Sequence, residues 1–560
     1  MKKWNLPRID SKFAVIALSV VTLVYFIVLP LAVLIYDSVM VNGTFDLSNY
    51  AAVYSQKVNL KALWNTVEIS LLVMVLSVLI TFPLAWLIGR TDLPGRKRFR
   101  TLMVASYMIP PYVGAIAWTQ LLNPDVGYLN QLLKTLFSLS QAPFNIYTRG
   151  GMIWVLTLFY SPFAFITISR AMEKMDPTLE EASRIAGASP LKALWDVTLP
   201  LMAPSILAGG LLVSIGAGSC FGIPAIVGMP GNIEVLTTRI VSFVYMGDDK
   251  GIRDATTLAV SLMFLANGLL FFMSWMLGRK DYTTISGKST RPVLVELGKW
   301  KGLAMFFVGA YAFLSVILPL GSIIMTSFMV SMSKGIRLDN FGIDAWIPVL
   351  ENSQYLDCIW RSLGYAFISA CIGTLLALFV AYLSVKTKVL GRSLPDILVM
   401  VGGSTPSVVI ALALIIFFSG NFGLNLYSTM WILIVSYLVK YMTMSVRTIA
   451  ASLSQISSSL EEAGLNAGAD WLRICKDIIM PLIAPSIVAG WFLIFMPSFY
   501  ELTMSNLLYG SDTQTIGVLL YELQTYADTQ NASVLSVIIL LIVMVGNLIL
   551  NKVSKGNIAI

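Results

Sequence analysis

Long apolar segments alternate with short polar ones along almost the whole chain. At about 1.5 Å of rise per residue, each can cross roughly 30 Å of hydrocarbon as a helix, so the pattern predicts an all-α polytopic membrane protein with about twelve transmembrane helices. Six precede a polar linker and six follow it. The predicted spans are residues 13–36, 64–89, 101–122, 151–171, 201–222 and 255–278, then 303–329, 360–384, 395–419, 430–448, 482–507 and 532–552.

The composition also favours lipid over water as the surrounding medium. Of the 560 residues, 57% are apolar and 12% are charged, whereas a soluble domain carries roughly a quarter charged residues. The chain has no histidine, which excludes histidine-based metal sites, proton shuttles and catalytic dyads. Its four cysteines, Cys220, Cys358, Cys371 and Cys475, lack the spacing of a zinc or disulfide motif. We therefore expect no catalytic residues and no metal site.

The basic residues predict the orientation of the helices. With the N-terminus inside, 27 of the 38 lysines and arginines fall on the inner side, 10 fall outside, and Lys440 lies within a span. Because inner loops are enriched in Lys and Arg, this asymmetry predicts that both termini are cytoplasmic. It also explains the net charge of +8 by membrane orientation, so we expect no nucleic-acid partner.

The two halves of the chain share a repeated sequence pattern. Trp64 matches Trp360 and Pro110 matches Pro406, both at a spacing of 296 residues. Farther along, residues 180–206 match residues 461–487 at a spacing of 281. We predict a first half at residues 1–280, a cytoplasmic linker at 281–302 and a second half at 303–560. An even number of helices per half makes the repeats parallel, and a pathway is expected between them.

A short motif recurs in the loop between the fourth and fifth helices of each half, at residues 178–200 and 459–481. Its glycine permits the sharp turn that ends a short helix, and its proline is tolerated where the next helix starts. A helix this short needs a partner surface to be stable, and two matched copies on the predicted cytoplasmic side favour docking over a plain amphipathic surface helix. The motif residues are Glu180, Glu181, Ala182, Gly187 and Pro200, then Glu461, Glu462, Ala463, Gly468 and Pro481.

These paired loops resemble the EAA loops of permeases of binding-protein-dependent (type I) ABC importers, and the resemblance extends over nearly the whole chain. Residues 221–225 and 500–503 make it greatest to the fused permeases for ferric iron, phosphorylated compounds and thiamine. The resemblance implies two MetI-like halves in a bacterial inner membrane, each with a coupling helix seated on one of two ABC ATPase copies. It also implies an external substrate-binding protein. Ferric iron is the first expected substrate; a phosphorylated sugar, an aminophosphonate or thiamine is the alternative.

No cofactor is expected on the chain itself, and ATP with Mg²⁺ should bind the partner ATPase. Gly287-Lys288-Ser289 is reminiscent of a P-loop, but Tyr282 stands where that motif needs its first glycine. The chain is therefore expected to be a non-catalytic subunit.

A secondary transporter of the major facilitator class is the alternative from another class. Residues 89–97 come close to its signature, although the Gly-to-Asp spacing is one residue short and Leu93 replaces a basic residue. The repeated loop has no role in that class. An intramembrane enzyme would need converging catalytic groups at membrane depth, and the sequence offers few.

Charged residues and prolines within the spans suggest a gate. Charge in hydrocarbon is costly, so such residues face a cavity or a partner, and proline inside a helix frees a carbonyl and creates a kink. Oxygen ligands would also suit a hard trivalent cation. The structural alternative is a helix cap or an internal ion pair, for instance with Lys440 or Arg361. The candidate gate residues are Glu68, Pro110, Pro111, Pro406, Tyr500 and Glu501.

Overall fold

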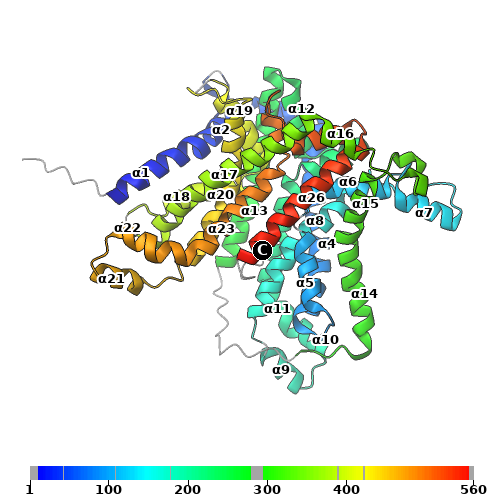
Figure 1. Ribbon diagram of the computed structural model, residues 1–560, viewed down its shortest axis with the longest axis horizontal. Coiled ribbons are helices and arrows are strands. Elements are labelled where there is room, and N and C mark those ends of the chain that lie inside the picture. The colour runs from blue at the N-terminus through cyan, green and yellow to red at the C-terminus, as the bar shows by residue number, and fades with distance from the viewer. Residues whose placement is uncertain are drawn as a thin grey trace, which may run out of the picture.

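The computed structural model describes residues 11–41, 43–106, 109–176, 178–278, 294–387, 390–420 and 423–553. Most of the predicted linker, including Gly287-Lys288-Ser289, lies outside these residues, as do both chain ends. The described part is almost entirely helical, and the helices of the two halves are inclined to each other (Figure 1). The expected all-α membrane fold is confirmed.

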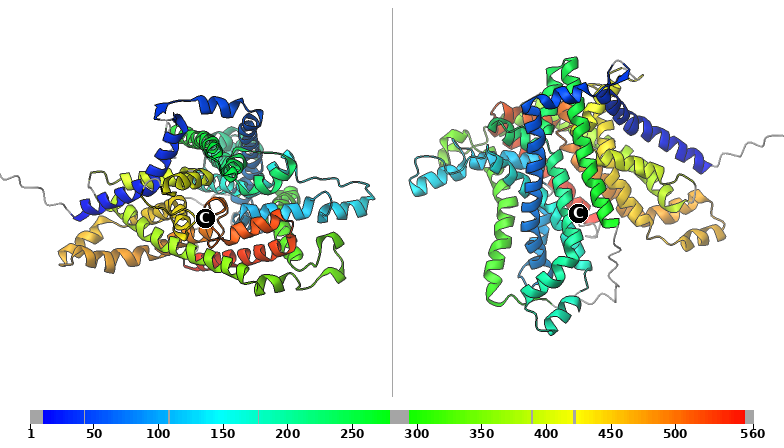
Figure 2. Two further views of the ribbon diagram at one scale, coloured as in Figure 1. Left: turned by 90° about the horizontal axis from the view of Figure 1, so that it is seen from above. Right: turned by 180° about the vertical axis from the view of Figure 1, so that it is seen from behind.

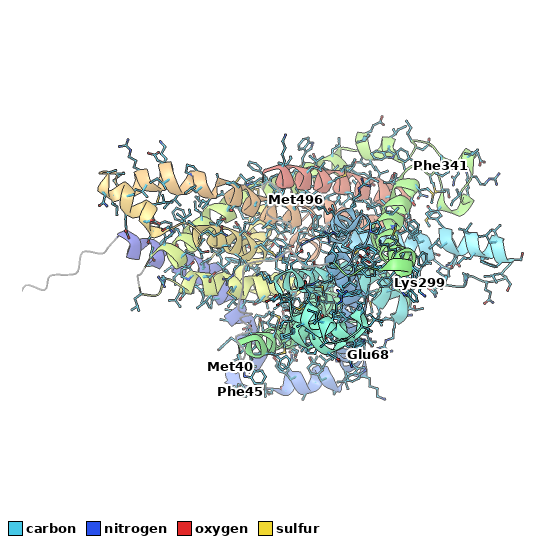
Figure 3. All side chains as sticks on the ribbon, turned by 90° about the horizontal axis from the view of Figure 1, so that it is seen from below. Met40, Phe45, Glu68, Lys299, Phe341 and Met496 are labelled. Atoms are coloured by element: carbon cyan, nitrogen blue, oxygen red, sulfur yellow. The ribbon has the colours of Figure 1, made fainter. Side chains whose placement is uncertain are left out.

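The first half contains the helices α1 to α13. They are α1 (Ser11–Leu23), α2 (Leu29–Val39), α3 (Ser48–Ser55), α4 (Lys57–Arg90), α5 (Arg96–Ala105), α6 (Pro111–Leu122), α7 (Tyr128–Phe137), α8 (Arg149–Lys174), α9 (Thr178–Ile185), α10 (Pro190–Ala193), α11 (Leu199–Ser219), α12 (Leu236–Met246) and α13 (Asp249–Gly278). A small antiparallel pair, β1 (Met40–Val41) and β2 (Thr44–Phe45), follows α2 and places Met40 opposite Phe45 (Figure 3).

The second half contains the helices α14 to α26. They are α14 (Lys301–Ala312), α15 (Leu318–Ser327), α16 (Trp346–Glu351), α17 (Ser353–Lys386), α18 (Leu394–Ser404), α19 (Ser407–Phe418), α20 (Met430–Leu453), α21 (Ser458–Asn466), α22 (Trp471–Ile474), α23 (Met480–Phe499), α24 (Ser505–Leu508), α25 (Ile516–Thr525) and α26 (Thr529–Val553).

Ten of the twelve predicted spans are helices that could cross a membrane unbroken, within the described residues. The other two are the third spans of the two halves, and each is divided at a proline. In the second half, α18 and α19 meet at an angle of 108° around Pro406. In the first half, α5 and α6 lie on either side of Pro110. The breaks lie where the sequence places prolines within the third spans, as predicted, because proline cannot donate the amide hydrogen bond that would carry the helix through.

The prolines of the repeated loops do not start the membrane helices as expected. The helix of the first half already begins at Pro190, and Pro200 lies within it, just after a π-helical turn at Leu194–Thr198. A matching π-turn, Cys475–Ile479, precedes Pro481. In each, the amide at the end of the turn reaches five residues back, from Leu199 to Leu194 and from Met480 to Cys475. The wider turn accommodates a proline without ending the helix.

Each half is built on a core of three mutually packed helices, α4, α8 and α11 in the first and α17, α20 and α23 in the second. Glycine lets these helices approach closely. A Cβ atom at Gly209 would lie 3.1 Å from Cα of Ala164, and one at the matched Gly490 would lie 3.3 Å from Cβ of Ser445. Small residues at such crossings are typical of membrane helix packing.

The two halves exchange their first helices. The helices α1 and α2 pack against α18 and α19 of the second half, while α14 and α15 pack against α5 and α6 of the first. Figure 2 shows α1 leaving its own half and running beside the second. Each first helix therefore covers the broken third span of the opposite half, which binds the halves into one body.

Candidate functional site

The repeated loops, which we call the EAA loops (residues 178–200 and 459–481), lie at separate corners of the molecule. Figure 1 shows α9 at the bottom and α21 with α22 at the left. Both helices project beyond the cores that carry them. This arrangement makes them available to two separate surfaces rather than to each other.

An identical turn closes α9 and α21. After α9, the amide of Gly187 donates to the Arg184 carbonyl at 3.0 Å, and the amide of Ala188 donates to the Ser183 carbonyl at 3.1 Å. Gly468 and Ala469 make the same two bonds, each 3.0 Å, to Leu465 and Gly464. These pairs of bonds define a Schellman motif, whose central residue is left-handed.

The two glycines have the backbone angles that this motif requires. Gly187 has φ +94° and Gly468 has φ +81°. An added Cβ atom would meet nothing within 4 Å at either position. Their requirement for glycine is therefore conformational rather than a matter of space.

A polar side chain starts the next helix in both loops. The Ser189 hydroxyl accepts a hydrogen bond from the Lys192 amide at 3.3 Å, and the Asp470 carboxylate accepts one from the Arg473 amide at 3.0 Å. These are N-caps, which satisfy amides that have no partner inside the helix. Both EAA loops are thus helix–turn–helix units with defined ends.

The outer faces of the EAA loops carry exposed apolar side chains. Leu179 and its counterpart Leu460 are 43% and 45% exposed, and Trp195 is 66% exposed. Glu462, Ala182 and Ala463 are exposed as well, while Glu181 is partly buried. Large apolar side chains exposed next to charged ones are typical of a protein–protein contact surface.

The first glutamate of each motif turns inward instead. Glu461 pairs with Lys386 at 2.8 Å, whereas Glu180 accepts a hydrogen bond from the Thr198 hydroxyl at 2.5 Å. Arg90, 3% exposed, occupies the place of Lys386 in the first half. Arg90 and Lys386 were not among the predicted site residues, although both are basic and lie 296 residues apart, the spacing of the repeat.

Two carboxylates, Asp176 and Asp92, make polar contacts that fix the chain around the first EAA loop. Hydrogen bonds from the backbone amide and the hydroxyl of Thr178 lower the pKa of the Asp176 carboxyl just before α9. The ammonium of Lys301, 2.6 Å away, lowers the pKa of Asp92. Val295 also pairs with Thr91 as a parallel bridge. The end of the linker is therefore attached to the end of α4. Thr91 and Asp92, which make this attachment, belong to the segment that resembles a facilitator signature.

The break at Pro406 is stabilised by Lys440 on α20. The Lys440 ammonium donates to the carbonyls of Gly403, at 3.2 Å, and Thr405, at 2.7 Å. These carbonyls belong to the last turn of α18, where the helix has no amide to offer them. The freed carbonyls are thus satisfied by protein, which is one of the two conditions under which they persist in a membrane.

Glu501 lies four residues before Ser505, where the short helix α24 begins, and is 5% exposed. One oxygen accepts from the amide of Met504 at 2.9 Å, and the other accepts from the amide and the hydroxyl of Ser505, both at 2.8 Å. Both oxygens therefore cap the helix. A role for Glu501 in a gate stays a prediction, and the cap is the role that the contacts display.

The segments that follow α11 in the first half and α23 in the second meet near Glu501. A Cβ atom on Gly222 would lie 2.7 Å from Cβ of Tyr112 and 3.5 Å from a methyl carbon of Leu502. The Phe221 and Tyr521 rings lie 5.8 Å apart. Pro111 directly precedes Tyr112 on α6. The candidate gate residues Pro111 and Glu501 are thus chain neighbours of residues that meet in one region between the halves.

Glu68 lies apart from this region. Its carboxylate pairs with Arg149 at 2.6 Å, and the same guanidinium group donates to Asn65 at 3.0 Å. Figure 3 shows Glu68 toward one edge of the molecule, well away from Met496 on α23. Of the two suggested partners, Arg361 pairs with Asp357 instead, whereas Lys440 lies within electrostatic reach of Glu501. Tyr500 lines an apolar pocket with Tyr441, Met496 and Val543.

Comparison with known proteins agrees with this architecture. Residues 81–280 and 372–554 match the family described as "Binding-protein-dependent transport system inner membrane component". The ferric transport system permease protein FbpB of Actinobacillus pleuropneumoniae is 25% identical over 531 residues, covering 90% of this chain and 73% of that protein. The Fe(3+)-transport system permease protein FbpB 2 of Haemophilus influenzae is 26% identical over 467 residues, covering 82% and 83%.

A crystal structure of a bacterial ABC transporter involved in alginate import is similar at 18% identity, with a TM-score of 0.41, over 48% of this chain and 95% of that one. The family model matches each half once and spans more than half of the chain. This chain therefore belongs to the family of inner membrane components of binding-protein-dependent transport systems, and is a multi-pass permease with two such domains in one polypeptide.

Proposed function

We propose that the chain forms the translocation pathway of an ATP-driven ferric iron importer and couples it to two copies of a separate ABC ATPase, one on each EAA loop. An external substrate-binding protein would deliver the cargo on the opposite side of the membrane. ATP and Mg²⁺ would bind the ATPase, and both chain termini would be cytoplasmic.

The matched pair of EAA helices is the observation that carries this proposal. Each is a short helix closed by the same turn, with a glycine at positive φ. A helix of this length is not stable through its own hydrogen bonds, and each exposes a leucine, Leu179 or Leu460. Two partner surfaces of the same kind would bury both, as expected if two copies of one ATPase dock.

The position of each loop explains how docking would act on the pathway. Each EAA loop joins two helices of a core, α8 to α11 in the first half and α20 to α23 in the second. These helices reach the region where Tyr112, Gly222 and Leu502 meet. Movement of the two loops toward each other on ATP binding would therefore rotate both cores and expose the pathway to alternate sides of the membrane.

Ferric iron is proposed as the cargo because the two relatives described above are named as ferric transport permeases, at 25% and 26% identity. This identity leaves a phosphorylated sugar, an aminophosphonate or thiamine as alternative cargoes. Within the residues the structure describes, no three Cys, Asp or Glu side chains are grouped to hold a metal ion. Cargo selection is thus assigned to the binding protein.

Reconstitution tests the proposal. The chain, its ATPase and its binding protein are placed in lipid vesicles, and uptake of ferric citrate labelled with radioactive iron is measured with and without ATP. ATP-dependent uptake that requires all three proteins is expected. Uptake of a phosphorylated sugar, an aminophosphonate or thiamine instead would change the cargo, and uptake without the ATPase would overturn the function.

A further inference from the structure

In each half, a core helix ends in a basic residue. Arg90 is the last residue of α4, and Lys386 is the last residue of α17. Arg90 donates to the carbonyls of Met172 and Met175 at 2.8 and 3.0 Å, and Lys386 donates to the Ile456 carbonyl at 2.8 Å. Met175 and Ile456 both lie in the short segment that leads into the EAA helix.

Both cations are withdrawn from solvent. Arg90 is 3% exposed, and the side chain of Lys386 is 9% exposed. Burial of a charge is costly unless the charge is paired and hydrogen-bonded. The carbonyls and carboxylates that contact Arg90 and Lys386 must therefore move together with the ends of α4 and α17.

The two halves differ in the partner of the motif glutamate. In the second half, Glu461 lies 2.8 Å from Lys386. In the first half, Glu180 accepts from Thr198, and Nε of Arg90 has no hydrogen-bond partner among the described residues. The second half has Ile479 where the first has Thr198, so a competing hydroxyl exists only in the first half.

We propose that Arg90 and Lys386 are positioning residues that hold the EAA helices to the ends of α4 and α17. Lys386 does so through a fixed pair with Glu461. Arg90 does so through a pair with Glu180 that forms in one transport state and is replaced by the Glu180–Thr198 bond in the other. Movement of an EAA helix is thereby transmitted to α4 or α17 as well as to the two core helices that the loop joins.

The proposal rests on the coupling function proposed above. Its test uses the assembled importer in vesicles, with transport and ATP hydrolysis measured on the same sample. Lys386→Gln and Arg90→Gln should each lower the transport per ATP hydrolysed by about tenfold, the size of a typical coupling free energy between sites. Lys386→Arg should retain coupling, because arginine fills this position in the first half.

The control is Arg337→Gln, which removes a cation outside the EAA loops that pairs with Asp339 in solvent at 3.3 Å. It should leave coupling unchanged. Gly468→Val serves as the reference for the loop itself. Normal coupling in both glutamine variants while Gly468→Val uncouples would overturn the positioning role. Normal coupling in Gly468→Val as well would refute the coupling function instead.

A second measurement does not depend on transport. A spin label at Leu465, 59% exposed on α21, reports the mobility of this helix in the chain alone, inserted in vesicles. Lys386→Gln should increase that mobility, whereas Arg337→Gln and Lys386→Arg should not. Equal mobility in all three variants would show that Lys386 does not hold the helix.

Discussion

The ammonium of Lys440 donates a hydrogen bond to the carbonyl of Thr405, 2.7 Å away, immediately before Pro406. The positive charge also interacts favourably with the negative end of the α18 helix dipole. The first half has Phe163 at the corresponding position, 277 residues earlier. The two broken spans are thus alike in sequence position but are stabilised differently.

Lys440→Met should destabilise the protein by about 1–3 kcal/mol, because the substitution leaves the carbonyls of Gly403 and Thr405 without their hydrogen-bond donor. The thermal midpoint of the purified protein in detergent checks this. Lys192→Met, an exposed lysine of the first EAA loop, is the control and should leave the midpoint unchanged. An unchanged midpoint for Lys440→Met would show that other groups satisfy the carbonyls.

Glu501→Gln should cost about 1–3 kcal/mol of stability, because an amide nitrogen cannot accept a hydrogen bond from Met504 or Ser505. Transport should fall along with the thermal midpoint. Glu462→Gln, at an exposed position, should leave the midpoint unchanged. A normal midpoint with lost transport would favour a gate role over the cap. Normal transport in the Glu501→Gln, Glu68→Gln double variant would rule out a carboxylate gate.

Gly187→Val and Gly468→Val should each destabilise the turn of an EAA loop by about 1–2 kcal/mol, the cost of a left-handed conformation for a side chain with a Cβ. Transport should be uncoupled from ATP hydrolysis, while membrane insertion stays normal. Gly187→Asn and Gly468→Asn are matched controls, because asparagine adopts positive φ more readily. Equal activity of the valine and asparagine variants would show that the turn does not matter for coupling.

The orientation is tested by labelling single cysteines in intact cells with a reagent that does not cross the membrane. Cysteines at Asp248 and Asp512 should react, and cysteines at Lys97 and Lys192 should react only after the membrane is opened. All four positions are exposed, so access depends on the side of the membrane alone. Labelling of Lys97 from outside would reverse the orientation and move the ATPase sites out of reach of ATP.

Sequence periodicity was sufficient for the spans and the repeat, because the surrounding lipid forces every spanning segment into an apolar helix. The repeated motif also located both EAA turns, since the glycine at positive φ is a local requirement. The effect of Pro200 was not predictable in the same way. Whether a proline starts a helix or is absorbed by a π-turn depends on the residues before it, which here continue the helix back to Pro190.

The partners of the charged residues could not be predicted from the sequence. Glu68 pairs with Arg149, 81 positions away, and Lys386 pairs with Glu461. Such pairs depend on how the helices pack, which the hydrophobic pattern leaves open. The exchange of first helices between the halves is of the same kind, because α2 has an apolar surface that could cover many neighbours.

The distance between the two EAA helices tests the central claim most directly. Spin labels at Ala182 and Ala463, both exposed and at matched positions, report this distance by double electron–electron resonance in the assembled importer. In Figure 1 the two helices lie at separate corners. We predict that ATP binding shortens the distance and that ATP hydrolysis restores it. A distance that is the same with and without ATP, in an importer that still transports, would contradict coupling through these loops.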